Sequence, residues 1–201
     1  RILKTFVLQL PESKEVTLLD EAGSALVSSR VGTPTVTVPG SDSQEIEGAL
    51  MSRFSVDDDL LPTAVVAVRL GGGNDGWLVG RVNLEEMWRM VDRIRVGEQG
   101  VAMLVGMRGQ LLAHGHLDEK QRVARGENLS SHPLLLALEN PEDGEPTPPL
   151  ASAEYDNGRD AVLGVAAHVP ALGWMVIVEQ PQSEAYAMAT RLQSQLGIAI
   201  G

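Results

Sequence analysis

An internal repeat constrains the fold of this chain more than any other feature of its sequence. Residues 64–68 (AVVAV) lead through a glycine-rich connection to a Gly-Trp strand at 76–79, and residues 161–165 (AVLGV) lead to a second such strand at 173–176. The two copies are 97 residues apart, from 64 to 161 and from 76 to 173. A fixed offset of this size means that one structural unit is used twice.

Each copy lies within the same order of predicted elements. Both halves open with two strands joined by a tight turn that contains glycine, at 16–20 and 24–29 and again at 101–106 and 110–116. Strand, tight glycine turn and strand together indicate a hairpin. Each Gly-Trp strand then leads into a segment with apolar residues at helical spacing, one over 84–95 and one over 183–196. The sequence therefore predicts an α+β fold of two similar modules, each an antiparallel sheet of about five strands flanked by helices.

The middle of the two modules differs. In the first module, residues 41–53 predict a helix, followed by a third strand at 54–58. In the second module we expect a helix at 131–140 and then an exposed loop of Pro, Gly and acidic residues at 141–149.

The chain ends and the boundary between the modules complete the plan. A helix is expected at 2–9, before Pro11. At the other end, residues 196–201 are apolar, which fits either the first residues of a membrane span or a frayed helix end. We place the boundary after Val96, so that the modules cover 1–96 and 97–201.

Composition excludes several classes of function. The formal net charge is -11 and no dense basic stretch occurs, so nucleic acid is not an expected partner. Arg89, Arg93 and Arg95 stand among acids at helical spacing and predict a solvated helix face. The chain has no cysteine, which rules out disulfides, zinc–thiolate sites and a cysteine nucleophile. No apolar run approaches the roughly 20 residues that span a bilayer.

Several segments of the second half resemble a known family. Residues 95–102 (RVGEQGVA) and 109–114 (GQLLAH) are similar to the opening of the membrane-proximal module of double Cache domains, where an "I-x-x-G-x-x-G" turn precedes a strand pair ending in "G-x-L-x-A-H". Residues 173–181 (GWMVIVEQP) and 184–186 (EAY) resemble that family's last strand and its helix toward the membrane. The resemblance covers about 79–196 and implies two PAS-like (Cache) modules in tandem.

The resemblance also implies a function. Domains of this family lie outside the inner membrane in histidine kinases, chemoreceptors and cyclases, bind small organic ligands, and pass a shift through their terminal helices. We therefore expect a periplasmic small-molecule sensing domain of a membrane-anchored receptor, foremost a sensor histidine kinase. A carboxylate or another polar metabolite is the expected ligand, and a weak homodimer through the N-terminal helix is expected. The alternative is the same fold acting as a ligand-free interaction module of a chemoreceptor or cyclase. The first module lacks the aromatic-and-arginine helix motif of the amino-acid-binding subgroup, so amino acids are not assigned as ligands.

Five residues are candidate ligand contacts. Arg69 and Arg81 are cations within apolar strands, where a guanidinium facing a cavity can bind a carboxylate through two bonds, although either can also lie at a sheet edge. Asp57 opens an acidic triplet that can bind an amine or form a solvated turn. Tyr155 precedes a good turn sequence, and His168 lies on the following strand; both can face a pocket over the second sheet.

No cofactor, metal site or catalytic residue is predicted. His114 and His116 share one face of a strand, but no further ligand spacing accompanies them, and a polar hairpin edge is favoured over a metal site. The glycine-rich segment 71–76 lacks the ending of a phosphate loop. No nucleophile motif occurs, so the fragment is not expected to be an enzyme.

Overall fold

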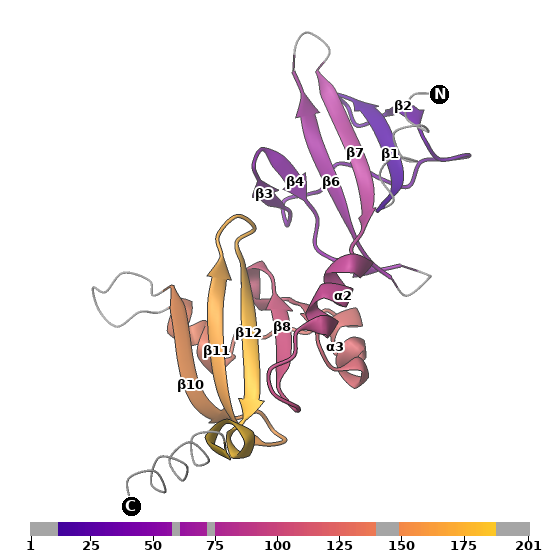
Figure 1. Ribbon diagram of the computed structural model, residues 1–201. Coiled ribbons are helices and arrows are strands. Elements are labelled where there is room, and N and C mark those ends of the chain that lie inside the picture. The colour runs from indigo at the N-terminus through magenta and orange to yellow at the C-terminus, as the bar shows by residue number, and fades with distance from the viewer. Residues whose placement is uncertain (1–11, 58–60, 72–74, 140–148, 188–201) are drawn as a thin grey trace, which may run out of the picture. The chain divides into compact units, whose positions relative to one another are not determined.

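The computed structural model describes residues 12–57, 61–71, 75–139 and 149–187 (Figure 1). The chain divides into two compact units, Arg1–Met87 and Trp88–Gly201. This division falls within helix α2 (Glu85–Arg93), on the N-terminal side of the boundary expected after Val96. The helix expected at 2–9 lies outside the described residues. Of the helix expected at 183–196, the described part shows residues 182–187 as helical.

The first unit is a seven-stranded antiparallel sheet with the spatial order β2-β1-β7-β6-β4-β3, in which β5 also pairs with β6. Its strands are β1 (Ser13–Asp20), β2 (Ala25–Ser28), β3 (Gln44–Ile46), β4 (Ala49–Met51), β5 (Ser55–Val56), β6 (Pro62–Leu70) and β7 (Gly76–Asn83). A small core of Leu19, Val36, Ala67 and Val79 packs on this sheet.

The helix predicted at 41–53 is wrong, because these residues form the hairpin β3–β4. Glu47 and Gly48 both have positive φ, 50° and 82°, as the two central residues of a type I′ hairpin turn do. β4 then pairs with β6 and Leu50 packs against the core, so tertiary pairing outweighed the helical spacing of the apolar residues. The strand predicted at 54–58 is present as the shorter β5.

The second unit is a five-stranded antiparallel sheet with the order β10-β11-β12-β8-β9, which agrees with the predicted number of about five, whereas the sheet of the first unit has two strands more. Its elements are β8 (Val101–Val105), the 3₁₀ turn η1 (Met107–Gly109), β9 (Leu111–His114), the 3₁₀ turn η2 (Leu117–Glu119), α3 (Lys120–Ala124), α4 (Pro133–Glu139), β10 (Leu150–Asp156), β11 (Ala161–Val169) and β12 (Trp174–Pro181). Strand β10 was not among the elements predicted from the sequence.

The two units repeat one plan, as the 97-residue offset predicts. In each, the first strand of the opening hairpin pairs with the last strand of the sheet, β1 with β7 and β8 with β12. The strand before the last pairs with its other edge, β6 with β7 and β11 with β12. Repeated order and repeated sequence landmarks together confirm the predicted α+β duplication.

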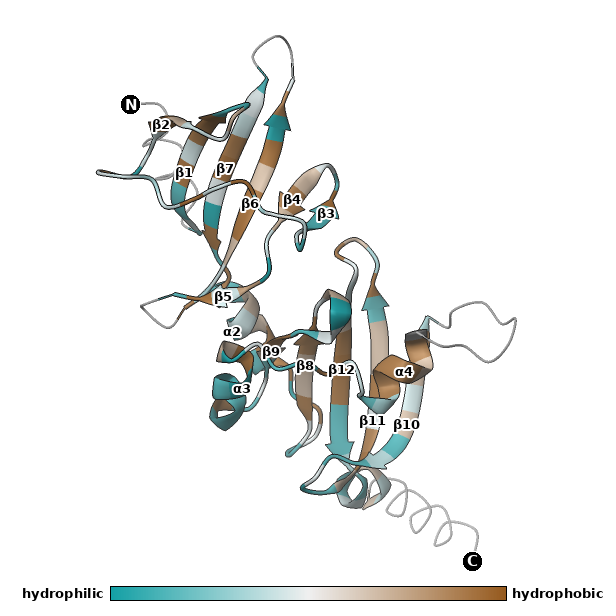
Figure 2. Ribbon diagram, turned by 180° about the vertical axis from the view of Figure 1, so that it is seen from behind, coloured by the Kyte–Doolittle hydropathy of each residue, from teal (hydrophilic) through white to brown (hydrophobic). Residues whose placement is uncertain are grey.

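The core of the second unit lies between its sheet and α4. Leu134, Leu135 and Leu138 of α4 are fully buried and pack against Met103 of β8 and Ile177 of β12. Figure 2 shows this apolar helix lying over β10 and β11. Burial of each such leucine is worth about 1.5–3 kcal/mol, so α4 is firmly anchored to the sheet.

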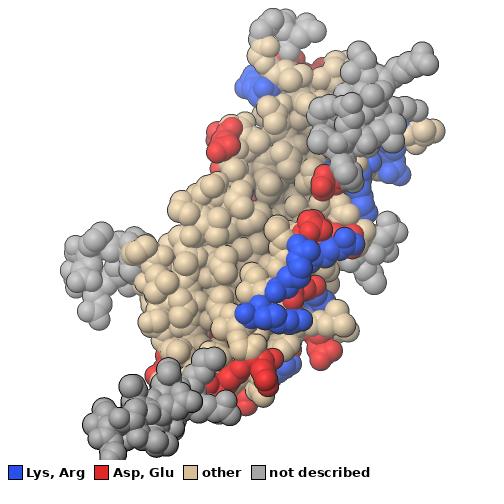
Figure 3. All heavy atoms as spheres, in the orientation of Figure 1, with Lys and Arg blue, Asp and Glu red and all other residues tan. Residues whose placement is uncertain are grey.

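Helix α2 begins at a polar cap and presents arginines to solvent. The side-chain oxygen of Asn83 accepts a hydrogen bond from the Glu85 backbone amide at 2.9 Å. Arg89, Arg93 and Arg95 are exposed, as predicted for a solvated face. On the face drawn in Figure 3, basic side chains gather in one diagonal band with acidic side chains next to them.

Candidate functional site

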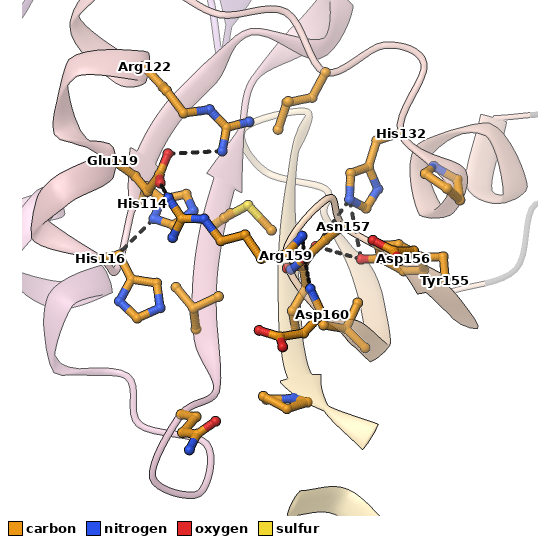
Figure 4. Close-up of a pocket in the computed structure, with 18 of the residues that line it drawn as sticks. His114, His116, Glu119, Arg122, His132, Tyr155, Asp156, Asn157, Arg159 and Asp160 are labelled. Atoms are coloured by element: carbon orange, nitrogen blue, oxygen red, sulfur yellow. Dashed lines mark hydrogen bonds and ion pairs between the residues drawn. The ribbon is translucent and has the colours of Figure 1, made fainter. Parts of the chain in front are cut away.

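A cleft with a volume of about 540 Å³ opens in the second unit (Figure 4). Its walls come from β8, the end of β9, η2 and α3, the segment before α4, the β10–β11 turn and the end of β12. The volume is within the range of small-molecule sites, roughly 300–1,000 Å³. The polar residues that line it are Glu98, Gln99, His114, His116, Glu119, Arg122, His132, Tyr155, Asp156, Asn157, Arg159, Asp160 and Glu179.

Glu179 of β12 is a buried carboxylate on one wall of the cleft, with 5% of its surface exposed. Its Oε1 accepts a hydrogen bond from the Tyr155 hydroxyl at 2.7 Å and lies 3.4 Å from His132 Nε2. Its Oε2 accepts from the Asn157 side-chain amide at 2.8 Å. Burial alone raises the pKa of Glu179, but these donors outweigh it and hold the pKa below 4.5, so the carboxylate is ionised at neutral pH.

The position of His132 is set by helix α4, which begins at the next residue. Its Nδ1 accepts a hydrogen bond from the Leu134 backbone amide at 3.3 Å, so in the neutral ring the proton lies on Nε2. That Nε2–H faces both Glu179 and the Tyr155 hydroxyl, which is 3.2 Å away. The start of α4 therefore fixes which ring nitrogen donates to the Glu179 carboxylate.

Tyr155 reaches Glu179 because Gly164 on the neighbouring strand leaves room for its ring. A Cβ at Gly164 would lie 2.6 Å from the Tyr155 hydroxyl oxygen and 2.8 Å from a methyl group of Leu134. The absence of a side chain at this position of β11 is thus a condition for the Tyr155–Glu179 hydrogen bond. Burial and the Glu179 charge both raise the pKa of Tyr155, so its hydroxyl stays protonated and donates.

Glu119 of η2 is the second buried carboxylate of the cleft, 6% exposed. Arg122 lies 3.1 Å from its Oε2, and the Arg159 guanidinium forms an ion pair with its Oε1. Arg122 also binds Glu127 through two nitrogens, at 2.7 and 2.5 Å. Burial raises the pKa of Glu119, but the hydrogen bond from Arg122 and the charges of both arginines lower it below 4.5.

His114, at the end of β9, lines the cleft and is 5% exposed. Its Nδ1 accepts a hydrogen bond from the His116 backbone amide at 3.1 Å, and the two imidazole rings stack at 5.8 Å. Burial lowers the pKa of His114 to about 4, with Arg122 and His116 adding to this effect, so the ring is neutral at pH 7. Among the described residues, no cluster of three or more histidine or acidic side chains has the geometry of a metal site.

The turn between β10 and β11 carries two residues across the cleft. The Asn157 side-chain oxygen accepts from the backbone amides of Arg159 and Asp160, both at 3.1 Å, and Gly158 has φ +87°. This tight turn directs the Asn157 amide to Glu179 and the Arg159 guanidinium to Glu119. One turn thereby bridges two walls of the cleft, as Figure 4 shows.

The cleft also adjoins the start of the C-terminal helix. Glu184 accepts hydrogen bonds from the backbone amides of Glu98, at 2.5 Å, and Gln99, at 3.1 Å. These bonds hold the pKa of Glu184 below its ordinary value. Gly97, with φ +64°, permits the turn, because a Cβ there would lie 2.1 Å from the Glu184 carboxylate. Because Glu98 and Gln99 line the cleft, the first turn of this helix is bonded directly to the cleft wall.

Of the five residues predicted as ligand contacts, the structure places Tyr155 in the cleft. His168 is exposed on β11 and does not line it. Arg69, Arg81 and Asp57 all belong to the first unit.

The three residues of the first unit are not gathered at one point. Asp57 forms an ion pair with Lys14 and lies beside the start of β6. Arg69 is near the other end of β6, roughly 23 Å along the strand, where it lies 4.0 Å from Glu21 and 5.8 Å from the Trp77 ring centre. The Arg81 guanidinium is 3.4 Å from the Thr35 carbonyl oxygen.

Sequence reasoning missed Glu179, His132, Asn157, Arg159 and Glu119 as members of a site. One signal was available: Glu179 is the single carboxylate in the otherwise apolar strand segment 174–179. A charged residue within a buried strand needs partners, and such residues cluster at functional sites.

The fold is two antiparallel α+β modules with a small-molecule-sized cleft in the second, and comparison with known proteins identifies the family. A profile of the Cache domain matches residues 1–189. The chain therefore belongs to the Cache domain family, which confirms the predicted family and the predicted class of small-molecule sensing domain. A search of curated protein sequences found no match.

Solved structures share this fold at low sequence identity. The extracellular domain of mmHK1S-Z3, a protein assigned as a histidine kinase, has a TM-score of 0.67 and 14% identity over 95% of this chain and 81% of its own. The ligand-binding domain of Mlp24 with asparagine has a TM-score of 0.57 and 15% identity, covering 92% and 78%. The domain of the Pseudomonas aeruginosa chemoreceptor PctB with L-glutamine has a TM-score of 0.58 and 16% identity, covering 96% and 79%.

Within the described ranges, no helix is long and apolar enough to cross a lipid bilayer. The apolar residues 196–201 lie outside those ranges.

Proposed function

We propose that this chain senses a small polar metabolite bound in the cleft of its second unit. The observation that carries the proposal is the pair of buried carboxylates, Glu119 and Glu179, held ionised on the walls of a 540 Å³ cleft. Burying a charge is costly, and a core built only for stability has little reason to retain two of them beside a cavity.

The proposed output is transmission through the C-terminal helix to a sensor histidine kinase in a membrane-anchored receptor, with the domain on the periplasmic side. The bonds from Glu184 to the Glu98 and Gln99 backbone support this, because a ligand that moves the cleft wall also moves the first turn of the helix. Only a ligand with different affinity for two helix arrangements can shift their equilibrium. The fragment itself is proposed to bind rather than catalyse. The weak homodimer through residues 2–9 stays a prediction.

Arg69 and Arg81 in the first unit stay predicted carboxylate contacts, each at its own position on the sheet. The Arg69 side chain is 61% exposed, and Nη2 of the half-buried Arg81 donates a hydrogen bond to the Thr35 carbonyl oxygen. The thermal-shift screen described next distinguishes binding at these arginines from binding in the cleft.

A thermal-shift screen against organic acids, amines, amino acids and other polar metabolites tests the proposal. A ligand at 100 times its Kd adds about 2.7 kcal/mol to stability, which gives a clear shift. We expect the shift to be lost in Tyr155→Ala and kept in Arg69→Ala, Arg81→Ala and His168→Ala, the last being a matched control on the adjacent strand. Loss in the arginine variants alone places the site in the first unit, and the absence of any ligand supports a ligand-free interaction module instead.

A further inference from the structure

The charge of the cleft points to the kind of ligand that it takes. Carboxylates outnumber arginines among the lining residues by five to two. The carboxylates are Glu98, Glu119, Asp156, Asp160 and Glu179, and the arginines are Arg122 and Arg159. A cavity lined by an excess of one charge concentrates ligands of the opposite charge.

Both arginines of the cleft already pair with carboxylates, which offset their positive charge. Arg122 is bound by Glu127 through two nitrogens and by Glu119 through a third contact. Arg159 is bound by Glu119. In contrast, the side-chain carboxylates of Glu98 and Asp160 have no ion pair or hydrogen bond with any residue in the described ranges.

Arg159 itself shows that the cleft accommodates a cation. Its side chain is 63% exposed and extends from the β10–β11 turn, whereas the Glu119 side chain that it reaches is 8% exposed. A largely exposed arginine side chain thus pairs with a buried carboxylate through its Nη2. An external ammonium or guanidinium group can make the same contact if the turn releases Arg159.

His114 provides an independent sign of a ligand. The residue is 95% buried, its Nδ1 is occupied as an acceptor, and its Nε2 has no hydrogen-bond partner among the described residues. Every fully buried side-chain nitrogen or oxygen in the described structure has a hydrogen-bond partner. His114 Nε2 has none within the described ranges, so this atom is not fully buried. Because His114 lines the cleft, its Nε2 is open to the cleft. The neutral ring offers an N–H donor there, which fits a hydrogen-bond acceptor on the ligand.

We propose that the cleft binds a small organic cation, an ammonium or guanidinium compound with a hydrogen-bond acceptor, whose charged group replaces Arg159 on Glu119. The inference rests on the proposed function, because it names the ligand class of the same cleft. The acceptor of the ligand faces His114 Nε2, and the carboxylates of Asp160 and Glu98 add to the attraction at the entrance.

Isothermal titration of the chain with three probes of similar length tests this inference. Lysine amide carries two positive charges and a carbonyl acceptor, 1,4-diaminobutane carries two positive charges without an acceptor, and succinate carries two negative charges. We expect lysine amide to bind more tightly than 1,4-diaminobutane, and succinate not to bind. Binding of the cations should weaken as salt is added, since charge attraction at an open cleft is screened.

Arg159→Gln should change the affinity of the cleft in opposite directions for cationic and anionic ligands. If a cation replaces Arg159, this variant removes its competitor and tightens lysine amide binding, on the order of fivefold for one charge at a partly exposed site. Asp160→Asn removes an attractive charge and should weaken binding about threefold. Arg125→Gln and Asp118→Asn are the matched controls, because both residues are exposed, lie near the cleft and do not line it.

The outcomes separate the inference from the proposed function. Tighter lysine amide binding in Arg159→Gln, with unchanged binding in Arg125→Gln, supports the cation. Succinate binding that is lost in Arg159→Gln, or a cleft-dependent ligand that is neutral, overturns the inference and leaves the cleft as a sensing site. Failure of both cations to bind also overturns it. If the wider screen yields no ligand sensitive to Tyr155→Ala, the proposed function itself is wrong.

Discussion

The buried neutral state of His114 should make the second unit lose stability on mild acidification. His114 has a pKa of about 4 in the folded chain and an ordinary value of 6.5 when burial is removed. Between these values the unfolded chain binds a proton that the folded chain does not. Stability is therefore fully present above pH 6.5, and it falls as the pH is lowered toward 4.

The size of the effect follows from the two pKa values. The shift of the His114 pKa from 6.5 to about 4 changes the free energy of unfolding by about 3 kcal/mol over the full pH range. About 2 kcal/mol of this change falls between pH 7 and pH 5. The groups that face the ring are Glu119, Arg122, His116 and Glu179. The acids among these have pKa values below 4.5, so their own titration affects stability below the pH 7–5 window.

Urea unfolding followed by tryptophan fluorescence measures this loss. In a Trp77→Phe background the remaining reporters, Trp88 and Trp174, both belong to the second unit. We expect the free energy of unfolding to fall by about 2 kcal/mol between pH 7 and pH 5. His114→Gln should abolish that fall, because the amide keeps a neutral polar group at this position, whereas His168→Gln, at an exposed histidine, should retain it. An equal fall in the His114→Gln variant would refute the reasoning.

Two further predictions concern the support of Glu179. Tyr155→Phe removes a hydrogen bond to a buried charge and should lower the free energy of unfolding by about 1.5–3 kcal/mol at pH 7, with a matched rise in the pKa of Glu179; an unchanged urea midpoint contradicts this. Gly164→Ala introduces a methyl group 2.6 Å from the Tyr155 hydroxyl and should cost about 1–3 kcal/mol. Gly158→Ala is the comparison, because Gly158 has positive φ but open space around it. If Gly164→Ala lowers the free energy of unfolding less than Gly158→Ala does, strand β11 accommodates the methyl group and the prediction is wrong.

The duplicated fold was predictable from the sequence, because its signals are local and repeated. Tight glycine turns, apolar strands and the Gly-Trp landmarks each occupy a few neighbouring residues, and the 97-residue offset ties the two copies together. Where local signals conflicted, the prediction failed: residues 41–53 have helical spacing, but the positive φ of Glu47 and Gly48 and the pairing of β4 with β6 form a hairpin.

The candidate site was only partly predictable. Tyr155 was found because it precedes a recognisable turn, whereas Glu119, His132 and Glu179 come from three elements that are far apart in the chain. No local pattern indicates that the β10–β11 turn carries Asn157 and Arg159 to two different carboxylates.

The sequence alone determined that this protein has two α+β modules of one plan, since turn and strand preferences act over short distances and the same landmarks occur twice. The tertiary structure alone decided where a ligand can bind, because pairing of β12 with both β8 and β11 brings Glu179 beside the cleft. Hydrogen-bond donors from distant segments outweigh burial and keep Glu179 and Glu119 ionised. Burial keeps His114 neutral. Such charges depend on the long-range contacts of the folded chain, which no short segment contains.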